Sequence, residues 1–158
     1  MPSITPNLWF DTEGEEAAEF YVSVFPNSRI KNVTHYGEAG PQEAGTVMTV
    51  DFVLDGQDFT AINGGPEFHF DEAISLLVNC ADQNEVDYYW TKLGEGGEEV
   101  QCGWLKDRYG LSWQVVPDGM EELFADPDQG RADRVMKAML GMKKLDLAAL
   151  RAAADGTA

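Results

Sequence analysis

Residues 15–25 read EEAAEFYVSVF and residues 84–93 read NEVDYYWTKL, and the likeness of these two stretches decides the fold class. Each has an acidic first turn, then an aromatic pair, then an apolar residue about one helical turn later. Acidic residues are favoured near the positive end of a helix, and apolar residues three and four positions apart form one buried stripe. Both stretches are therefore predicted to be amphipathic helices, and their recurrence indicates a duplicated unit.

The same order of elements is expected around both helices, in residues 4–64 and, in shorter form, in residues 73–116. Predicted strands of the first half cover residues 7–10, 28–36, 48–54 and 57–63, and those of the second cover 73–79, 100–105 and 111–116. Apolar and polar residues alternate from Met48 to Leu54, which predicts a strand with one face toward the helix. Such a unit cannot bury its own sheet face, so it must pair with its copy or with another chain. A ligand cleft framed by curved half-sheets is expected.

The ends of the predicted helices are marked by capping residues. Thr12 is the expected cap of the first helix and Asp82 that of the second. After the sheet region, residues 119–154 are predicted to form a helical C-terminal extension. It contains a short helix at 121–125, a helix that starts at the 126–128 break and runs to 142, and another at 143–154. An apolar tail of this kind more often packs on the domain or on a partner subunit than binds ligand.

Composition excludes several classes of partner. The 158 residues predict a single domain, 1–158, and 28 acidic against 11 basic residues give a formal charge of -17. This charge repels phosphate backbones and anionic lipid, so neither nucleic acid nor membrane is an expected partner. No basic, apolar leader and no membrane-length apolar run is found, which predicts a cytoplasmic protein.

The cysteines are compatible with a reducing compartment. Cys80 and Cys102 are the two thiols of the chain, and with the two histidines they form no recognisable zinc-binding spacing. A disulfide between them requires their strands to be neighbours. His69 is a candidate general base at neutral pH, with a solvent-facing loop position as the alternative.

Several sequence strings resemble a known family. They are PNLWFD at 6–11, AEFY at 18–21, AINGGP at 61–66, DQNEVDYYW at 82–90 and CGWLKDRYGLSWQ at 102–114. Together they resemble the PhnB-like family, often labelled as a 3-demethylubiquinone-9 3-methyltransferase domain. That family belongs to the vicinal oxygen chelate superfamily of glyoxalase I, bleomycin-resistance proteins and extradiol dioxygenases. The resemblance implies an α+β fold of paired βαβββ modules and, usually, a homodimer.

The resemblance also locates the positions at which metal enzymes of this superfamily carry their ligands. Counting from the family landmarks places the third position at Ser75 and the fourth at Gln114. A further position falls near Ala61 or Asn63, and another within residues 4–7. Neutral amide and hydroxyl oxygens bind transition metals weakly, because they neither offset the charge of the ion nor supply imidazole nitrogen. Neither a metal nor another cofactor is therefore expected.

In the absence of a metal site, the neutral polar and aromatic residues of the expected cleft predict a cavity for a small, flat organic ligand. Gln114, Ser75 and Asn63 are expected to orient the ligand by hydrogen bonds. Flat apolar walls are expected from Trp9, Phe68, Trp104 and Trp113, with core packing as the alternative for each.

Two further function classes stay open. One is an enzyme, either the methyltransferase of the family label or a lyase or isomerase that requires an added divalent ion. A methyl donor is usually held at a glycine-rich turn between strand and helix, whereas the glycines at 37–45 and 64–65 link predicted strands. The other is a dimeric module that only contacts a partner protein.

Overall fold

The computed structural model describes residues 2–157. The chain divides into two compact units, Met1–Phe70 and Asp71–Ala158. The boundary between the units falls between the two predicted halves, 4–64 and 73–116. The prediction of a single domain, 1–158, depends on how the two halves are arranged relative to each other, and it stays a prediction.

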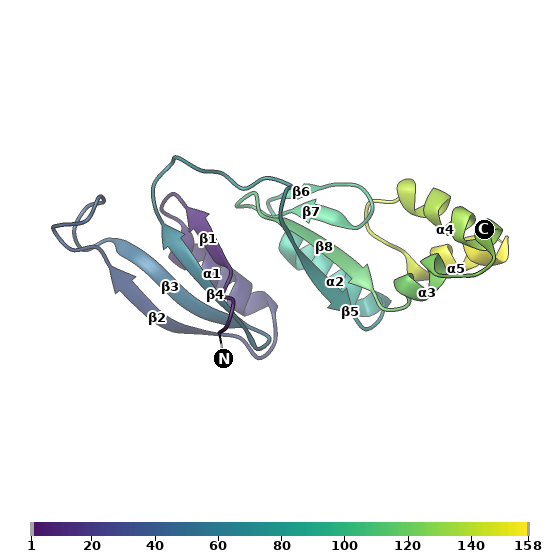
Figure 1. Ribbon diagram of the computed structural model, residues 1–158, viewed down its shortest axis with the longest axis horizontal. Helices are drawn as coiled ribbons and strands as arrows, with labels where there is room; N and C mark the ends of the chain where they lie inside the picture. The colour runs from purple at the N-terminus through teal and green to yellow at the C-terminus, as the bar shows by residue number, and fades with distance from the viewer. Residues whose placement is uncertain (1, 158) are drawn as a thin grey trace. The chain divides into compact units, whose positions relative to one another are not determined.

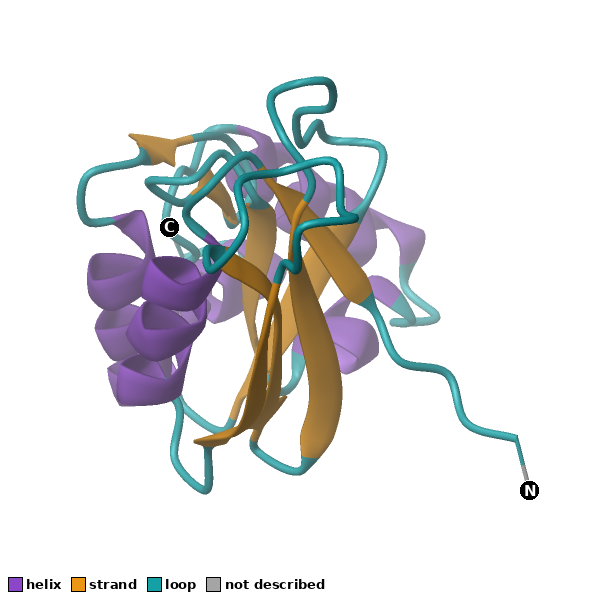
Figure 2. Ribbon diagram, turned by 90° about the vertical axis from the view of Figure 1, so that its left-hand side faces the viewer, coloured by secondary structure: helices purple, strands orange, loops and turns teal. Residues whose placement is uncertain are grey.

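The first unit is a four-stranded sheet with one long helix. Its elements are β1 (Asn7–Phe10), α1 (Gly14–Val24), β2 (Arg29–His35), β3 (Val47–Leu54) and β4 (Gln57–Asn63). The strand order is β1-β4-β3-β2, with β1 parallel to β4 and the other pairs antiparallel (Figure 1). The residues before β1 extend away from the strands (Figure 2).

Helix α1 covers one face of this sheet because its apolar residues recur at helical spacing. Ala17, Ala18 and Tyr21 are fully buried. The ring of Tyr21 lies 6.4 Å from that of Phe52, which in turn stacks 5.5 Å from Phe59. Buried aromatic pairs of this kind contribute about 0.5–1.5 kcal/mol each beyond the area they bury. The core of the first unit thus lies between α1 and the facing side of β3 and β4.

The start of α1 differs from the prediction. The cap residue is Glu13 rather than Thr12, and its side chain makes no capping hydrogen bond. The amide of Gly14 instead donates to Asn63 Oδ1 at 2.7 Å. A Cβ at position 14 would lie 2.6 Å from that oxygen, so only glycine permits this approach. A side chain from a distant strand therefore replaces the expected local cap.

The second unit repeats the topology of the first. Its elements are β5 (Ser75–Cys80), α2 (Gln83–Gly94), β6 (Glu98–Glu99), β7 (Trp104–Lys106) and β8 (Ser112–Pro117). The strand order is β5-β8-β7-β6, with β5 parallel to β8 (Figure 1). In both units the first and fourth strands are the parallel neighbours. The predicted α+β fold of two βαβββ modules with C-terminal helices is confirmed.

Helix α2 is built as its sequence predicts. Asp82 caps it, accepting a hydrogen bond from the amide of Glu85 at 2.9 Å. Val86, Trp90 and Leu93 form its buried stripe. The strand predicted at 100–105 is wrong in its bounds, because the chain turns between β6 and β7.

Three helices follow the second sheet. They are α3 (Met120–Phe124), α4 (Gln129–Leu140) and α5 (Leu147–Asp155) (Figure 1). Their own core contains Met120, Val135, Leu145 and Leu150, with Ala154 beside them. Within residues 2–157, no helix is long and apolar enough to cross a membrane.

Candidate functional site

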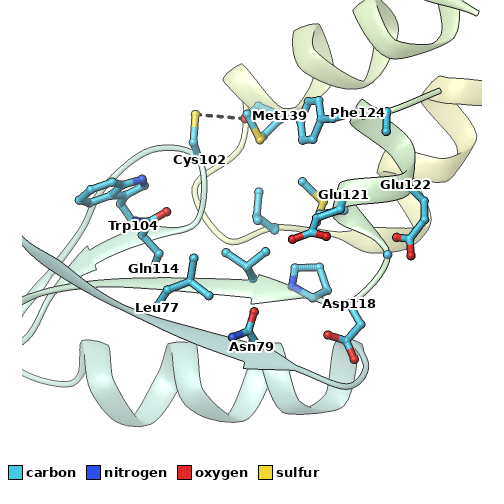
Figure 3. A pocket seen from close by; sticks show the side chains of 16 residues that line it. Leu77, Asn79, Cys102, Trp104, Gln114, Asp118, Glu121, Glu122, Phe124 and Met139 are labelled. Carbon is cyan, nitrogen blue, oxygen red and sulfur yellow. Dashed lines mark hydrogen bonds between the residues drawn. The ribbon is translucent and has the colours of Figure 1, made fainter. Parts of the chain in front are cut away.

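A cavity of about 920 Å³ lies in the second unit, between the sheet face opposite α2 and the helices α3 and α4 (Figure 3). Leu77, Trp104 and Gln114 line it from the sheet, and Met120, Phe124 and Met139 line it from the helices. Ligand sites in proteins are commonly concave and mostly apolar, with a few polar groups that fix orientation. This cavity has that composition.

The sheet wall is a row of three cross-strand neighbours. Gln114 on β8 pairs with Leu77 on β5 and with Trp104 on β7. Side chains that lie directly opposite one another on neighbouring strands project from the same face, so the amide is flanked by an aliphatic and an aromatic group. Leu77 is 48% exposed although it is apolar. Figure 3 shows these side chains on the face of the sheet opposite α2.

Gln114 is held in place by a second residue predicted for the site. Its Nε2 donates to Ser75 Oγ at 2.9 Å. Ser112, two residues before Gln114 and on the same sheet face, is 1% exposed, and its hydroxyl has no hydrogen-bond partner within residues 2–157. A buried hydroxyl without a partner costs free energy, but Ser112 does not line the cavity, so Gln114 is the polar group that this strand presents there.

The helical wall was not predicted as part of a site. Met139 lies on α4, in the apolar C-terminal extension, for which packing on the domain or on a partner subunit was expected more often than ligand binding. Phe124 and Met139 are both half-buried. Asp118, Glu121 and Glu122 are exposed at the edge of the cavity, as Figure 3 shows. Nothing in the sequence indicates that α3 faces a sheet strand, because that contact depends on how the extension folds back.

The extension is fixed to the second sheet by its α4–α5 connection. The amides of Cys102 and Gly103 donate to the carbonyls of Met142 and Lys143, each at 2.8 Å. A Cβ at position 103 would lie 2.9 Å from Leu145 Cδ1, and the φ of Gly103 is +83°. Leu145 itself is 1% exposed. The close approach of Gly103 therefore allows this connection to pack on the sheet.

Gln83, in the first turn of α2, makes a second attachment. Its Nε2 donates to the Leu145 carbonyl at 2.9 Å, and its Oε1 accepts from the Leu147 amide at 2.8 Å. Lys144 forms an ion pair with Asp87 at 2.8 Å. The side chain of Gln83 thus satisfies backbone groups on both sides of Asp146, where α5 begins.

Trp113 does not belong to this cavity, which corrects its prediction as a wall beside Gln114. Successive residues of a strand face opposite sides of the sheet. Trp113 is 2% exposed, and its Nε1 donates to Asp107 Oδ2 at 2.9 Å. Asp107 Oδ1 also accepts from the amides of Tyr109 and Leu111, at 2.8 and 3.1 Å. Core packing, the stated alternative for the aromatic residues, holds for Trp113.

The predicted residues of the first unit form two separate arrangements. Trp9 packs edge to face against Phe68 with ring centroids 5.0 Å apart, and its Nε1 donates to the Gly65 carbonyl at 3.0 Å. Asn63 lies on the helix side of the sheet, with its Oδ1 bound to Gly14 and its Nδ2 donating to Val47 at 3.2 Å. The amide of Asn63 therefore supports α1.

Asn63 also borders a second, acidic cavity of about 610 Å³ in the first unit. Carboxylates of Asp11, Glu13 and Glu43 are among its lining residues, together with Tyr36. The Tyr36 hydroxyl donates to the Asn63 carbonyl at 2.5 Å. The polar groups of Asn63 and Tyr36 are thus occupied by contacts within the unit.

The residues at the superfamily's metal-ligand positions do not fit a transition metal. Ser75 and Gln114 supply a hydroxyl and an amide that bind each other. In the described part of the chain, no three His, Cys, Asp or Glu side chains are grouped so that they could hold an ion. His69 is exposed and lines neither cavity. Cys80 and Cys102 are free thiols rather than a disulfide.

Two successive βαβββ modules with this strand order define a glyoxalase-like protein of the vicinal oxygen chelate fold. The chain belongs to the family described as 3-demethylubiquinone-9 3-methyltransferase, whose model matches residues 2–116. None of the curated proteins compared with the chain matches it.

Solved structures agree with this assignment. A putative 3-demethylubiquinone-9 3-methyltransferase, PhnB protein, from Bacillus cereus is 37% identical, with a TM-score of 0.67 over 73% of this chain and 99% of that chain. Protein PA1353 from Pseudomonas aeruginosa is 20% identical, with a TM-score of 0.62 over 74% and 98%. The fosfomycin resistance protein FosX from Listeria monocytogenes is 11% identical, with a TM-score of 0.52 over 77% and 97%. The latter two show the fold alone.

Proposed function

We propose that this protein binds a small, flat organic molecule in the cavity of the second unit, without a metal ion. The observation that carries the proposal is the row Leu77–Gln114–Trp104 along one wall of a cavity of about 920 Å³. An indole and an aliphatic side chain offer flat apolar surface, and the amide between them supplies both a donor and an acceptor. Ser75 fixes the orientation of that amide.

A ligand screen by thermal shift tests the proposal. Bound ligand stabilises the folded protein by RT ln(1 + [L]/Kd), about 2.7 kcal/mol at a hundredfold excess over Kd. Planar aromatic compounds should raise the melting temperature of the wild-type chain, and Gln114→Leu should reduce that rise. Gln101→Leu is the matched control, because Gln101 is an exposed amide of the same unit that does not line the cavity. A diverse library that produces no shift would contradict the proposal.

The family description supports a second candidate, methyl transfer. A methyl donor such as S-adenosylmethionine is usually held at a glycine-rich turn between a strand and a helix. Here the strand-to-helix turns at residues 11–13 (DTE) and 81–82 (AD) contain no glycine, and the turn at 118–119 (DG), before the five-residue helix α3, contains a single glycine rather than a glycine-rich run. Ligand binding therefore has the stronger physical support. Calorimetry with S-adenosylmethionine separates the two, since a saturable heat with a one-to-one stoichiometry would favour the enzyme.

A lyase or isomerase that requires an added divalent ion is the other form of enzyme. FosX from Listeria monocytogenes, 13% identical, is described in a complex with Mn(II) and sulfate. In this chain, Ser75 and Gln114 supply no imidazole or carboxylate at the corresponding positions. Turnover of 2-oxoaldehyde adducts with nickel, zinc or manganese would overturn the preference for binding.

We further propose that the protein is a homodimer. In the first unit α1 covers one sheet face, whereas Trp9 and Ile62 on the other face are only half-buried. Phe68 and Ile74 are 60% and 64% exposed. Apolar surface of this kind is commonly covered by a second copy of the chain. Light scattering at micromolar concentration should give twice the mass of one chain, and a purely monomeric mass would refute the proposal.

The expected location is the cytoplasm, where thiols stay reduced. The free thiols of Cys80 and Cys102 support this. Fluorescence of a tagged chain in intact and permeabilised cells tests it.

A further inference from the structure

The two walls of the cavity in the second unit come from different parts of the chain. The sheet wall lies within residues 2–116, which match the family. Six of the lining residues lie within residues 2–116, and the other ten lie from Pro117 to Leu145. The Bacillus cereus relative is matched over 99% of its length by only 73% of this chain. The helical wall is therefore an addition to the matched fold.

This added wall is held at a fixed place on the sheet. The connection from Met142 to Leu147 is bound through the amides of Cys102 and Gly103 and through both polar atoms of Gln83. These partly buried hydrogen bonds and the buried side chain of Leu145 give the connection one position rather than many. The α4 side chains that face the cavity are thereby positioned by the fold.

The chemistry of the helical wall differs from that of a site for anions. Met120, Phe124 and Met139 present apolar and polarisable groups, and thioethers adapt well to flat aromatic surfaces. The charged residues that line the cavity are all acidic, namely Asp118, Glu121 and Glu122. An anionic group that entered the cavity would lose hydration without gaining a cationic partner.

We propose that the C-terminal extension α3–α5 selects the ligand of this cavity, and that it admits a flat, apolar molecule that carries no anionic group. The inference rests on the proposed function, because it names the ligand class for the same site. Met139 is the residue through which α4 exerts this selection. It faces the cavity directly opposite the sheet wall that contains Trp104 and Gln114 (Figure 3).

Two dyes of opposite character test the proposal on the full-length chain. Nile red is planar and uncharged, and 8-anilinonaphthalene-1-sulfonate is aromatic and anionic. Both gain fluorescence in apolar surroundings, so each Kd follows from a titration. The wild-type chain should bind Nile red at least about tenfold more tightly than the sulfonate, because the charged residues that line the cavity are all acidic and give the sulfonate no cationic partner.

Helix α4 provides its own matched control. Met136 lies three residues before Met139, is 43% exposed and does not line the cavity. Met139→Ala should weaken Nile red binding about fivefold, whereas Met136→Ala should leave it unchanged. Met139→Arg should strengthen sulfonate binding about tenfold relative to Met136→Arg, which changes the net charge equally. Circular dichroism checks that each variant folds. If Met139→Arg does not fold, the Nile red affinities of Met139→Ala and Met136→Ala decide the test.

The possible results separate this inference from the function on which it rests. If the wild-type chain binds neither dye, the proposed function fails for flat apolar ligands and the inference fails with it. If both dyes bind equally, or if the Met139 variants behave as the Met136 variants do, binding stands and selection by the extension is refuted.

Discussion

Gln114 Nε2 on β8 donates to Ser75 Oγ on β5 at 2.9 Å, across 39 residues of sequence. Counting from the family landmarks assigns both residues to positions at which metal enzymes of the superfamily carry ligands, and here their side chains bind each other. A neutral hydrogen-bonded pair has no charge to offer a divalent ion, and the pair leaves one face of the amide directed into the cavity. This contact is the physical reason for preferring ligand binding over metal-assisted chemistry.

The first prediction concerns metal content. Protein purified without chelator should carry substoichiometric zinc, nickel, iron and manganese, since Ser75 and Gln114 provide only neutral hydroxyl and amide oxygens. Elemental analysis of the unmodified protein measures this. One equivalent of tightly held metal in contact with Gln114 would show that the reasoning about the ligand set is wrong.

The second prediction is that a metal site needs both positions changed. Gln114→Glu alone should not create tight binding, because imidazole nitrogen is still missing. Adding Ser75→His should raise the zinc affinity measurably, since a carboxylate and an imidazole then lie on neighbouring strands. Calorimetric titration of both variants with zinc gives the comparison, and equal affinities would contradict the prediction.

The third prediction tests the attachment of the extension at Gly103. Gly103→Ala introduces a Cβ 2.9 Å from Leu145 Cδ1 at a φ of +83°. Gly45→Ala is the matched control, because Gly45 has a φ of +89° but nothing within 4 Å of the added Cβ. The control should lose about 1 kcal/mol of unfolding free energy from the backbone conformation alone. Gly103→Ala should lose about 2–3 kcal/mol, because Leu145 must also move. Urea denaturation measures both, and equal losses would mean that the contact contributes nothing.

The fourth prediction concerns Asp107, which is 3% exposed. Asp107→Ala removes the acceptor for two backbone amides and for the indole of Trp113, all of them in or beside the turn before β8. Leaving a buried donor unsatisfied costs about 1–3 kcal/mol, so a loss of about 3 kcal/mol in unfolding free energy is expected. Asp58→Ala, which breaks a surface ion pair with Lys31, should cost less than about 1 kcal/mol. Similar losses in the two variants would refute the role given to Asp107.

The fifth prediction separates the two thiols. Burial, and secondarily the carboxylates of Glu85, Asp118 and Asp82, raises the pKa of the Cys80 thiol to about 12. Because the thiolate is the reactive form, iodoacetamide at pH 8 should modify Cys102 and spare Cys80 in the folded protein. Peptide mass spectrometry measures the modification of each site. Equal modification would show that Cys80 is accessible.

The same shift has a consequence for stability at alkaline pH. The folded-state pKa lies above that of the unfolded chain, so the contribution of Cys80 is fully present below the unfolded value and is lost as pH rises toward 12. Cys80→Ala should therefore flatten the fall in unfolding free energy between about pH 9 and pH 11. An unchanged slope would contradict this.

The elements defined by local pattern were predictable. The acidic first turns and apolar stripes of α1 and α2 gave both helices, and Asp82 was recognised as a cap because its carboxylate acts three residues away. The start of α1 was missed for the opposite reason. The backbone amide of Gly14, the first residue of α1, donates to the side chain of Asn63, which lies 49 residues further along the chain. No local sequence pattern indicates that contact.

The residues of the candidate site likewise fall into those that the sequence predicts and those that only tertiary contacts bring together. Family landmarks located Ser75 and Gln114 on facing strands, but the prediction placed Trp113 and Gln114 in one cavity although successive residues of a strand face opposite sides of the sheet. Which side is the core was decided by α2, which buries Trp113 and leaves Gln114 toward the cavity. The sequence by itself thus determined the duplicated βαβββ modules, because helix and strand periodicity is a local property of the chain. Only the tertiary structure decided that Met139 and Phe124 form a wall opposite Gln114. Their position depends on hydrogen bonds from Gln83, Cys102 and Gly103 to a connection some 40 to 60 residues away, and on the space that Gly103 leaves for Leu145.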